Sequence, residues 1–275
     1  MKKTGVWAAA AVLALAWGSA QADVLADIQK KGEIVVGVLG TDEPNSFIDP
    51  KTRELVGYDV DLAKAVATKL GVKPVFKQLT VAARIPELQQ GHVDLLAASL
   101  THTKEREAQL EFSITTFITG QTVLVKKSSG INDVPDLAGK RVVTVKGGTQ
   151  EPNTKKAVPT ATVITFDTAP QAFQALQQGK AAAFVNDDKS VVRALVQLGE
   201  QGKDYKILPS NLSIEPLALG IKKGELTLKK AVDDSLRELE ASGKAEALYE
   251  QWYGQASPLK MPKRNFKLDS DKVAD

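Results

Sequence analysis

The chain has 275 residues, of which 43% are hydrophobic and 25% are charged, a composition typical of an ordinary soluble globular protein. This length is enough for two domains, each with its own core. The formal net charge of +3 is too small for the basic surface of a nucleic-acid-binding protein, so we expect no nucleic-acid partner. The chain contains no Cys, which excludes both disulfides and a lipid-bearing cysteine.

Residues 1–22 have the pattern of a cleavable signal peptide. Lys2 and Lys3 precede an apolar run from Val6 to Trp17, and Ala20-Gln21-Ala22 fits a small-residue cleavage site. The alternative is a membrane anchor, but the apolar run is short for a span. We predict cleavage after Ala22 and a periplasmic protein. No later stretch is long and apolar enough to cross a bilayer.

The rest of the chain alternates segments of helical and strand periodicity, which indicates an α/β fold. In chain order we predict a helix over 27–31, strand 33–39, a loop over 40–47, a hairpin-like return over 52–58, helix 59–70, strand 73–79, helix 82–90, strand 93–98, helix 104–110, extended segment 111–127, strand 141–145, a glycine turn over 146–151 that starts a helix, strand 162–166, helix 169–178, strand 181–185, helix 190–198, strand 205–208, extended segment 215–222, a helical region 228–253 broken at Gly243, and a surface tail from 255.

Several polar side chains follow the predicted strand 93–98. Ser99 and Thr101 come where the strand is expected to end, and Arg106 lies about one helical turn further on. Ligands of open α/β sheets bind outside the carboxyl ends of strands. Two hydroxyls and the planar fork of an Arg suit a carboxylate. The alternative is a solvated charge pair within Lys104-Glu-Arg-Glu107.

This stretch has an echo later in the chain. Leu-Gln-Gln-Gly occurs at 88–91 and again at 176–179, and Ser99 and Asp187 each lie eight residues after the last glycine. Two similar units suggest two lobes whose strand ends face one cleft. One lobe offers Arg and hydroxyls and the other a carboxylate, which suits a ligand with both a carboxylate and an ammonium group. A chance likeness of a common helix-Gly-strand pattern is the alternative.

Three further positions are candidates for the cleft. Arg84 starts a predicted helix on the same rim as Ser99, and the alternative is that Glu87 simply neutralises its charge. The turn Lys146–Glu151 offers backbone N–H groups to an anion but lacks both the Walker and the G-x-G-x-x-G spacing. Phe47, in the loop after the first strand, either packs over a ligand or fills the core of its own lobe.

The ordered set of motifs resembles the polar-amino-acid family of periplasmic solute-binding proteins that serve ABC importers. The resemblance covers nearly the whole mature chain. It rests on Leu55-Val-Gly-Tyr-Asp-Val-Asp-Leu-Ala-Lys64, Leu88-Gln-Gln-Gly-His-Val-Asp94, Thr101-His-Thr-Lys-Glu-Arg106 with Phe112-Ser113, Asp136-Leu-Ala-Gly-Lys140, Gly147-Gly-Thr149, Gly179 to Asp187, and Leu248-Tyr-Glu-Gln-Trp-Tyr253.

The resemblance implies a two-lobed type II periplasmic-binding-protein fold whose lobes are joined by two extended crossing segments. Lobe 1 is then 23–118 with 216–275, and lobe 2 is 119–215. It implies an amino acid as ligand, an ABC permease as partner, no cofactor or metal, and a monomer. Arg106 would hold the α-carboxylate with Ser99 and Thr101, Thr149 would add a backbone donor, and Asp187 would take the α-ammonium group.

The pocket for the ligand side chain carries signals for more than one class of amino acid. The segments Arg84-Ile-Pro86, Ala183-Phe184 and Asn265–Leu268 resemble the glutamate/aspartate branch, in which a cation at the Arg84 position meets the side-chain carboxylate. An acidic ligand is therefore favoured. Two departures keep a neutral polar or basic amino acid open: the loop after the first strand lacks the branch's Arg and carries Asp42 and Glu43, and Ala169 replaces a His.

An enzyme is the competing class, because cyclohexadienyl dehydratase uses the same fold. Catalysis needs a positioned acid or base, and the sequence offers only His92 in a turn and His102 near the cleft rim. The motifs G-x-S-x-G and H-E-x-x-H are missing, as is a Cys nucleophile. A receptor sensor domain would need a following membrane span, which the sequence lacks. We expect a binding protein.

Overall fold

The computed structural model describes residues 23–274, so the predicted signal peptide and its cleavage site lie outside the described residues. The helices are α1 Val24–Lys31, α2 Tyr58–Leu70, α3 Arg84–Gln89, α4 Lys104–Glu107, α5 Gln150–Ala157, α6 Ala169–Gln177, α7 Asp188–Leu198, α8 Leu226–Ala241 and α9 Lys244–Trp252, with 3-10 turns η1 Val81–Ala83, η2 Lys127–Ser129, η3 Val134–Leu137 and η4 Gly199–Asp204. The strands are β1 Glu33–Leu39, β2 Thr41–Asp42, β3 Ser46–Ile48, β4 Leu55–Val56, β5 Lys73–Leu79, β6 Leu95–Thr101, β7 Leu110–Lys126, β8 Arg141–Val145, β9 Thr162–Phe166, β10 Ala183–Asp187, β11 Tyr205–Ile207 and β12 Ser213–Lys222. Within residues 23–274, no helix has the length and apolar character that a membrane crossing requires.

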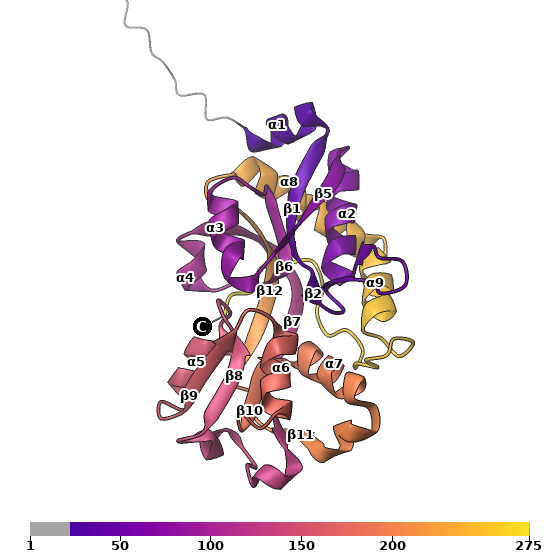
Figure 1. The fold of residues 1–275 in the computed structure, drawn as a ribbon. Helices are drawn as coiled ribbons and strands as arrows, with labels where there is room; N and C mark the ends of the chain where they lie inside the picture. The colour runs from indigo at the N-terminus through magenta and orange to yellow at the C-terminus, as the bar shows by residue number, and fades with distance from the viewer. Residues whose placement is uncertain (1–22, 275) are drawn as a thin grey trace, which may run out of the picture.

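A two-lobed α/β architecture arises from one hydrogen-bonded path of strands. Its order is β5-β1-β6-β12-β7-β10-β8-β9, with β11 paired to β7. Strands β5, β1 and β6 pair in parallel and form lobe 1, while β10, β8 and β9 pair in parallel and form lobe 2. Figure 1 shows α1–α4, α8 and α9 around the first group and α5–α7 around the second. This is the predicted fold class.

The long strands β7 and β12 connect the two lobes. They pair antiparallel from Ser213 with Gln121 to Lys222 with Leu110. β6 joins β12 near one end, and β10 joins β7 at Gln121–Val125 near the other. The predicted extended crossings are thus paired strands (Figure 1). The predicted lobe boundaries, at 118/119 and 215/216, fall inside these strands and stay predictions.

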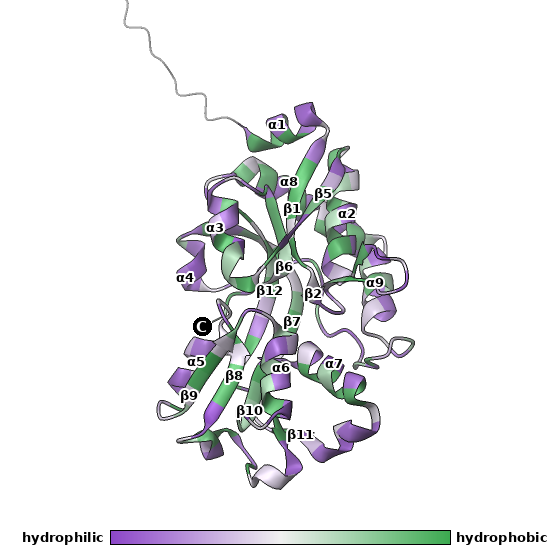
Figure 2. Cartoon of the chain, viewed as in Figure 1, coloured by the Kyte–Doolittle hydropathy of each residue, from purple (hydrophilic) through white to green (hydrophobic). Residues whose placement is uncertain are grey.

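Each lobe has its own apolar core. In lobe 1, Ile34, Val36 and Val38 of β1 pack with the inner faces of α2 and α8. In lobe 2, Val123, Val142 and Val185 form a cluster on one side of the sheet, and Phe173 and Phe184 belong to a cluster on the other. Figure 2 shows hydrophobic strands inside and hydrophilic outer helix surfaces. The apolar side chains alternate along the strands and recur about every 3.6 residues along the helices. Burial of these two kinds of face in each core places the strand ends between the lobes.

The segments 33–39, 73–79, 141–145 and 162–166 form strands with the predicted limits, and the helical region breaks at Gly243 as predicted. Two predicted limits near the cleft were wrong. Strand β6 runs from Leu95 to Thr101 instead of over 93–98, because β12 pairs with Leu100 and Thr101 and extends the strand, and Ser99 and Thr101 lie at its carboxyl end as predicted. Helix α4 ends at Glu107, and Leu110 begins β7 instead, because its partner Lys222 on β12 holds it in the sheet.

Candidate functional site

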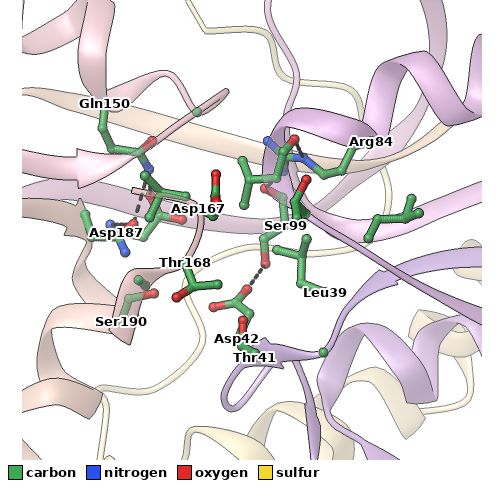
Figure 3. A pocket seen from close by; sticks show the side chains of 18 of the residues that line it. Leu39, Thr41, Asp42, Arg84, Ser99, Gln150, Asp167, Thr168, Asp187 and Ser190 are labelled. Carbon is green, nitrogen blue, oxygen red and sulfur yellow. Dashed lines mark hydrogen bonds between the residues drawn. The ribbon is translucent and has the colours of Figure 1, made fainter. Parts of the chain in front are cut away.

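A cavity of about 290 Å³ lies between the lobes. Lobe 1 contributes Leu39, Gly40, Thr41, Asp42, Gln78, Leu79, Thr80, Val81, Arg84, Ser99 and Thr101, and lobe 2 contributes Val145, Gly148, Thr149, Gln150, Asp167, Thr168, Ala169, Asn186, Asp187 and Ser190. Figure 3 shows Asp42, Ser99 and Arg84 on one side of the cavity and Asp187 and Gln150 on the other. The two echo strands, β6 and β10, therefore end at the same cavity, as the repeat predicted.

Ser99 is held in an unusual backbone conformation at the edge of this cavity. Its φ of +49° lies in the left-handed region, which a residue with a Cβ rarely adopts. The Asp59 carboxylate accepts the Ser99 backbone N–H at 2.9 Å, and Asp42 accepts the Ser99 hydroxyl at 2.7 Å (Figure 3). Two carboxylates from separate segments thus fix the orientation of the Ser99 hydroxyl.

Arg84 begins α3 and is 3% exposed. Its guanidinium donates to the carbonyl oxygens of Val81, Ala98 and Ser99 at 2.8–2.9 Å, and to that of Gly147 in lobe 2 at 3.4 Å. Burial, with the neighbouring charge of Arg106, lowers the pKa of Arg84 to about 9, so the side chain stays charged at neutral pH. These four bonds use four of the five N–H donors of the guanidinium.

Arg106 lies beside Arg84 but is not among the described residues that line the cavity. It donates to the Thr101 carbonyl at 2.9 Å and to the Gly147 carbonyl at 3.3 Å. Burial also lowers the pKa of Arg106. The two guanidinium groups therefore meet at one carbonyl oxygen of lobe 2, which makes this spot strongly attractive to an anion.

Asp187 presents the opposite charge from the end of β10. One carboxylate oxygen accepts from Gln150 at 3.0 Å, and the other is 3.2 Å from the ammonium group of Lys189. Asp187 is 7% exposed and the Lys189 side chain only 1%. The predicted acceptor for a ligand ammonium group thus already has an internal cationic partner.

Thr149 joins the cavity to the crossing strands. Its hydroxyl donates to Glu215 at 2.9 Å, accepts from Gln121 at 2.6 Å and lies 3.5 Å from the Thr101 hydroxyl of lobe 1. Glu215 is 1% exposed and lies on β12, and Gln121 lies on β7. A buried polar network therefore couples the base of the cavity to the segments about which the lobes would move.

The lobes touch in two further places. A Cβ on Gly147 would lie 2.6 Å from the Cα of Ala82, so the turn before α5 packs directly on lobe 1. Across the cavity rim, Glu43 of lobe 1 forms an ion pair with Arg193 of α7. These contacts, together with the Arg84 and Arg106 bonds to Gly147, indicate a closed arrangement.

Two sequence candidates lie elsewhere. Phe47 packs edge-to-face against Trp252, with ring centroids 6.0 Å apart, and is not among the described cavity residues. Phe47 is half-buried and belongs to none of the buried apolar clusters in residues 23–274, so this arrangement matches neither of the two expectations for it. His102 stacks on Phe112 at 4.1 Å and lies 2.8 Å from Glu107, also away from the cavity. Neither ring reaches a molecule in the cavity in this arrangement.

Sequence reasoning missed four residues of the site. Asp59 stood inside a quoted motif, Leu55–Lys64, but only its role in a helix was considered. Glu215 is a lone acid that opens an apolar crossing segment, and Gln121 is its counterpart on the other crossing. Lys189 directly follows Asp187-Asp188, and nothing local predicts its burial. In residues 23–274, no cluster of three or more His, Cys, Asp or Glu side chains is suited to a metal ion.

Comparisons with known proteins agree with this geometry. The profile of "Bacterial extracellular solute-binding proteins, family 3" matches residues 34–255. The ABC transporter glutamine-binding protein of Bacillus subtilis (strain 168) is 33% identical over 234 residues, which are 84% of each chain. The glutamate/aspartate import solute-binding protein of Escherichia coli (strain K12) is 32% identical over 287 residues, covering 95% of this chain and 92% of that one.

A solved structure extends the likeness to three dimensions. An ancestral amino acid-binding protein, described as a precursor of cyclohexadienyl dehydratase, superimposes with a TM-score of 0.75 at 33% identity. The match covers 84% of this chain and 100% of the ancestral protein. Because the family profile spans both lobes and the cavity between them, the chain belongs to the bacterial extracellular solute-binding proteins of family 3.

Proposed function

We propose that this chain is the periplasmic amino-acid-binding component of an ABC importer, acting as a monomer and delivering its ligand to a membrane permease. The observation that carries the proposal is the charge arrangement across the cleft. Arg84 and Arg106 of lobe 1 meet at one side, and Asp187 of lobe 2 lies at the other. A zwitterionic ligand satisfies both charges only when the lobes are closed.

In this proposal the remaining N–H donors of Arg106 hold the α-carboxylate beside the Gly147 carbonyl. The Ser99 and Thr101 hydroxyls and the Thr149 backbone complete its surroundings, and Asp187 accepts the α-ammonium group. Bonds to both lobes exist only in the closed form, so the ligand shifts the equilibrium toward closure. The permease then distinguishes the closed shape from the open one.

For the ligand side chain we favour a neutral amide of the size of glutamine. The acidic interpretation depends on Arg84, but carbonyl oxygens take four of its N–H donors, and Asp42 lines the same cavity. An amide both accepts from the remaining N–H of Arg84 and donates to Asp42. A carboxylate would face repulsion from Asp42. Both a glutamine-binding and a glutamate/aspartate-binding relative are about one-third identical to this chain.

An acidic ligand is the second candidate, and the charge of Arg84 is the observation in its favour. A dehydratase-like enzyme is less well supported. The histidine nearest the cleft in sequence, His102, stacks on Phe112 and does not line the cavity, so it is not in position to transfer a proton to or from a bound molecule.

The test is a thermal-shift panel of the twenty amino acids on protein that has been unfolded and refolded to remove bound ligand. A ligand at 100 times its Kd stabilises the native state by about 2.7 kcal/mol, which is roughly 5–10 °C for a chain of this size. We expect the largest shift with glutamine. A shift confined to glutamate and aspartate would favour the acidic candidate, and no shift with any amino acid would reject the binding function and make prephenate turnover the next assay.

Two variants separate the side-chain alternatives. Asp42→Asn should weaken the binding of glutamine more than that of glutamate. The substitution removes the negatively charged acceptor for the ligand amide, and it also removes the charge that repels a ligand carboxylate. Arg84→Ala should weaken both ligands to a similar degree if Arg84 mainly holds backbone carbonyls. A selective loss of glutamate in Arg84→Ala would instead support the acidic candidate.

A further inference from the structure

We infer that Lys189 is a specificity-determining residue, a built-in cation that makes the cleft unfavourable for ligands with a basic side chain. This inference rests on the proposed amino-acid-binding function. Lys189 lies in the first turn of α7, its side chain is 1% exposed, and its ammonium group is 3.2 Å from Asp187. A lysine this deeply buried is rare unless it is paired.

The Lys189 ammonium group belongs to lobe 2 but reaches an aromatic cluster of lobe 1. It lies 5.5 Å from the centre of the Phe117 ring, which packs in turn on Tyr58 at 5.8 Å and on Tyr253 at 4.8 Å. A cation over an aromatic face is stabilised by the ring quadrupole. The charge is therefore held in one place, where the two lobes meet.

Three carboxylates surround this position. Asp187 is in direct contact, and Asp42 and Asp59 of lobe 1 also attract the ammonium group. Their combined attraction outweighs burial and raises the pKa of Lys189, so it is charged at any physiological pH. Asp42 and Asp59 are linked to each other through Ser99, which bonds to both. Lys189 is thus the shared counter-ion of an acidic cluster that spans the cleft.

This arrangement has a consequence for ligand choice. Asp42 and Asp187 line the cavity, and without a counter-ion they would attract a basic side chain as well as the α-ammonium group. Lys189 itself is not among the described lining residues, so it acts through its charge rather than by contact. A second cation entering the cavity meets repulsion from Lys189, Arg84 and Arg106 in a region of low dielectric, whereas a neutral or acidic side chain does not.

The experiment compares glutamine, glutamate and ornithine, three α-amino acids of the same carbon-chain length whose side chains carry 0, −1 and +1 charge. Their Kd values are measured by titration calorimetry on the refolded wild-type chain, Lys189→Met and Lys189→Arg. We expect Lys189→Met to raise the affinity for ornithine at least tenfold relative to that for glutamine. The same substitution should lower the affinity for glutamate relative to that for glutamine. Lys189→Arg keeps the charge and should leave the order of the three ligands unchanged.

Ratios of Kd values separate specificity from a structural role. A general loosening of closure in a Lys189 variant changes the affinity for all three ligands equally and cancels in the ratio, whereas the loss of the counter-ion of Asp42 and Asp187 does not. Equal changes for the three ligands, or a wild-type chain that prefers ornithine, would overturn the inference while leaving the binding function intact. Wild-type protein that binds none of the twenty amino acids would overturn both.

A second substitution covers the case in which Lys189→Met does not fold. Lys189→Gln removes the charge but keeps a hydrogen-bond donor for Asp187, and it should shift the ligand ratios in the same direction. An unchanged ornithine-to-glutamine ratio in folded Lys189→Gln would contradict the inference as directly as the same result for Met.

Discussion

Single residues of the cleft are constrained by carboxylates that come from distant parts of the chain. Ser99 keeps a left-handed φ of +49° because Asp59, forty residues earlier, accepts its N–H, while Asp42 accepts its hydroxyl. Asp59 is itself 6% exposed. Such a buried carboxylate costs folding free energy when it is ionised, and its bond to the strained Ser99 fits a role in shaping the site.

This cost gives a pH-dependent prediction for Asp59. Burial raises its pKa from the ordinary 3.8 to about 6, although Lys189 attracts its charged form. Between about pH 4 and 6 the native state holds a proton that the unfolded state has released, so this contribution to stability falls as pH rises. Asp59→Asn still accepts the Ser99 N–H but does not titrate. Between pH 4 and pH 7 we expect the free energy of unfolding of the wild type to fall by about 2–3 kcal/mol relative to that of Asp59→Asn.

Urea unfolding at several pH values between 4 and 7 measures this difference. Asp136→Asn is a suitable control, because backbone N–H groups of Asn132 and Asp133 hold the pKa of Asp136 below its usual range. The contribution of Asp136 changes only below about pH 5, so Asp136→Asn and the wild type should keep a nearly constant difference in free energy of unfolding across most of this range. A difference between Asp59→Asn and wild type that stays constant with pH would show that Asp59 ionises normally in the native chain.

At this scale the sequence was informative about residue type more than about contacts. Ser99, Thr101, Thr149, Arg84 and Asp187 were expected at a cleft and do line one cavity. The hydrogen bonds of Arg84 to four carbonyl oxygens could not be foreseen, because they depend on where η1, β6 and a turn of the other lobe meet. The burial of Lys189 likewise depends on how α7 packs against β7.

Among the elements, the turn between β8 and α5 is the part of lobe 2 that seats on lobe 1. Gly147 in this turn has a φ of +83°, its carbonyl accepts from Arg84 and Arg106, and its Cα faces Ala82 with no room for a Cβ. The turn therefore requires glycine for two separate reasons, one within its own lobe and one that exists only when the lobes are closed.

Two glycine substitutions separate these reasons. Gly147→Ala and Gly179→Ala both place a Cβ at a positive φ, of +83° and +71°, and both should lose about 1–2 kcal/mol of folding free energy. A Cβ on Gly179 meets nothing within 4 Å, whereas one on Gly147 would meet Ala82 at 2.6 Å. We expect Gly147→Ala to weaken ligand binding more than tenfold, because closure is blocked, and Gly179→Ala to leave it within about twofold. Equal affinities in the two variants, by calorimetry, would mean that this contact does not limit closure.

Element limits followed the sequence where local pattern and long-range pairing agree. The runs 33–39 and 162–166 are β-branched along their length and form strands with the expected limits. The strand predicted over 93–98 instead ends at Thr101, because Leu100 and Thr101 pair with β12. A strand partner more than one hundred residues away leaves no trace in the local pattern, so the sequence could not predict this extension.

At the scale of the whole molecule, the two lobes meet through a few local contacts around the cavity. In residues 23–274 the chain passes between the lobes through β7 and β12, and both strands carry buried polar side chains, Gln121 and Glu215, at the level of the cavity. The two-lobed plan was predictable from the Leu-Gln-Gln-Gly repeat. The degree of closure was not, since it depends on contacts between surfaces that share no sequence pattern.

The Glu43–Arg193 pair tests this view of closure. It joins the loop after β1 to α7 across the cavity rim, with about one-quarter of each side chain exposed: 31% for Glu43 and 22% for Arg193. Because the pair exists only in the closed form, its free energy adds to that of ligand binding. A partly exposed pair contributes about 0.5–1 kcal/mol, so Arg193→Gln and Glu43→Gln should each weaken ligand binding about two- to fivefold.

A double-mutant cycle with scattering gives the decisive measurement. The double variant should bind ligand no more weakly than either single variant, since one change already breaks the pair. Small-angle scattering should report a larger radius of gyration for the ligand-free variants than for the wild type, with the difference reduced at high salt. Lys155→Gln breaks a pair with Glu151 inside α5 of lobe 2 and should change neither quantity. Additive losses in the cycle, or an unchanged radius of gyration, would mean that closure is set by Gly147 and the cavity floor instead of the rim.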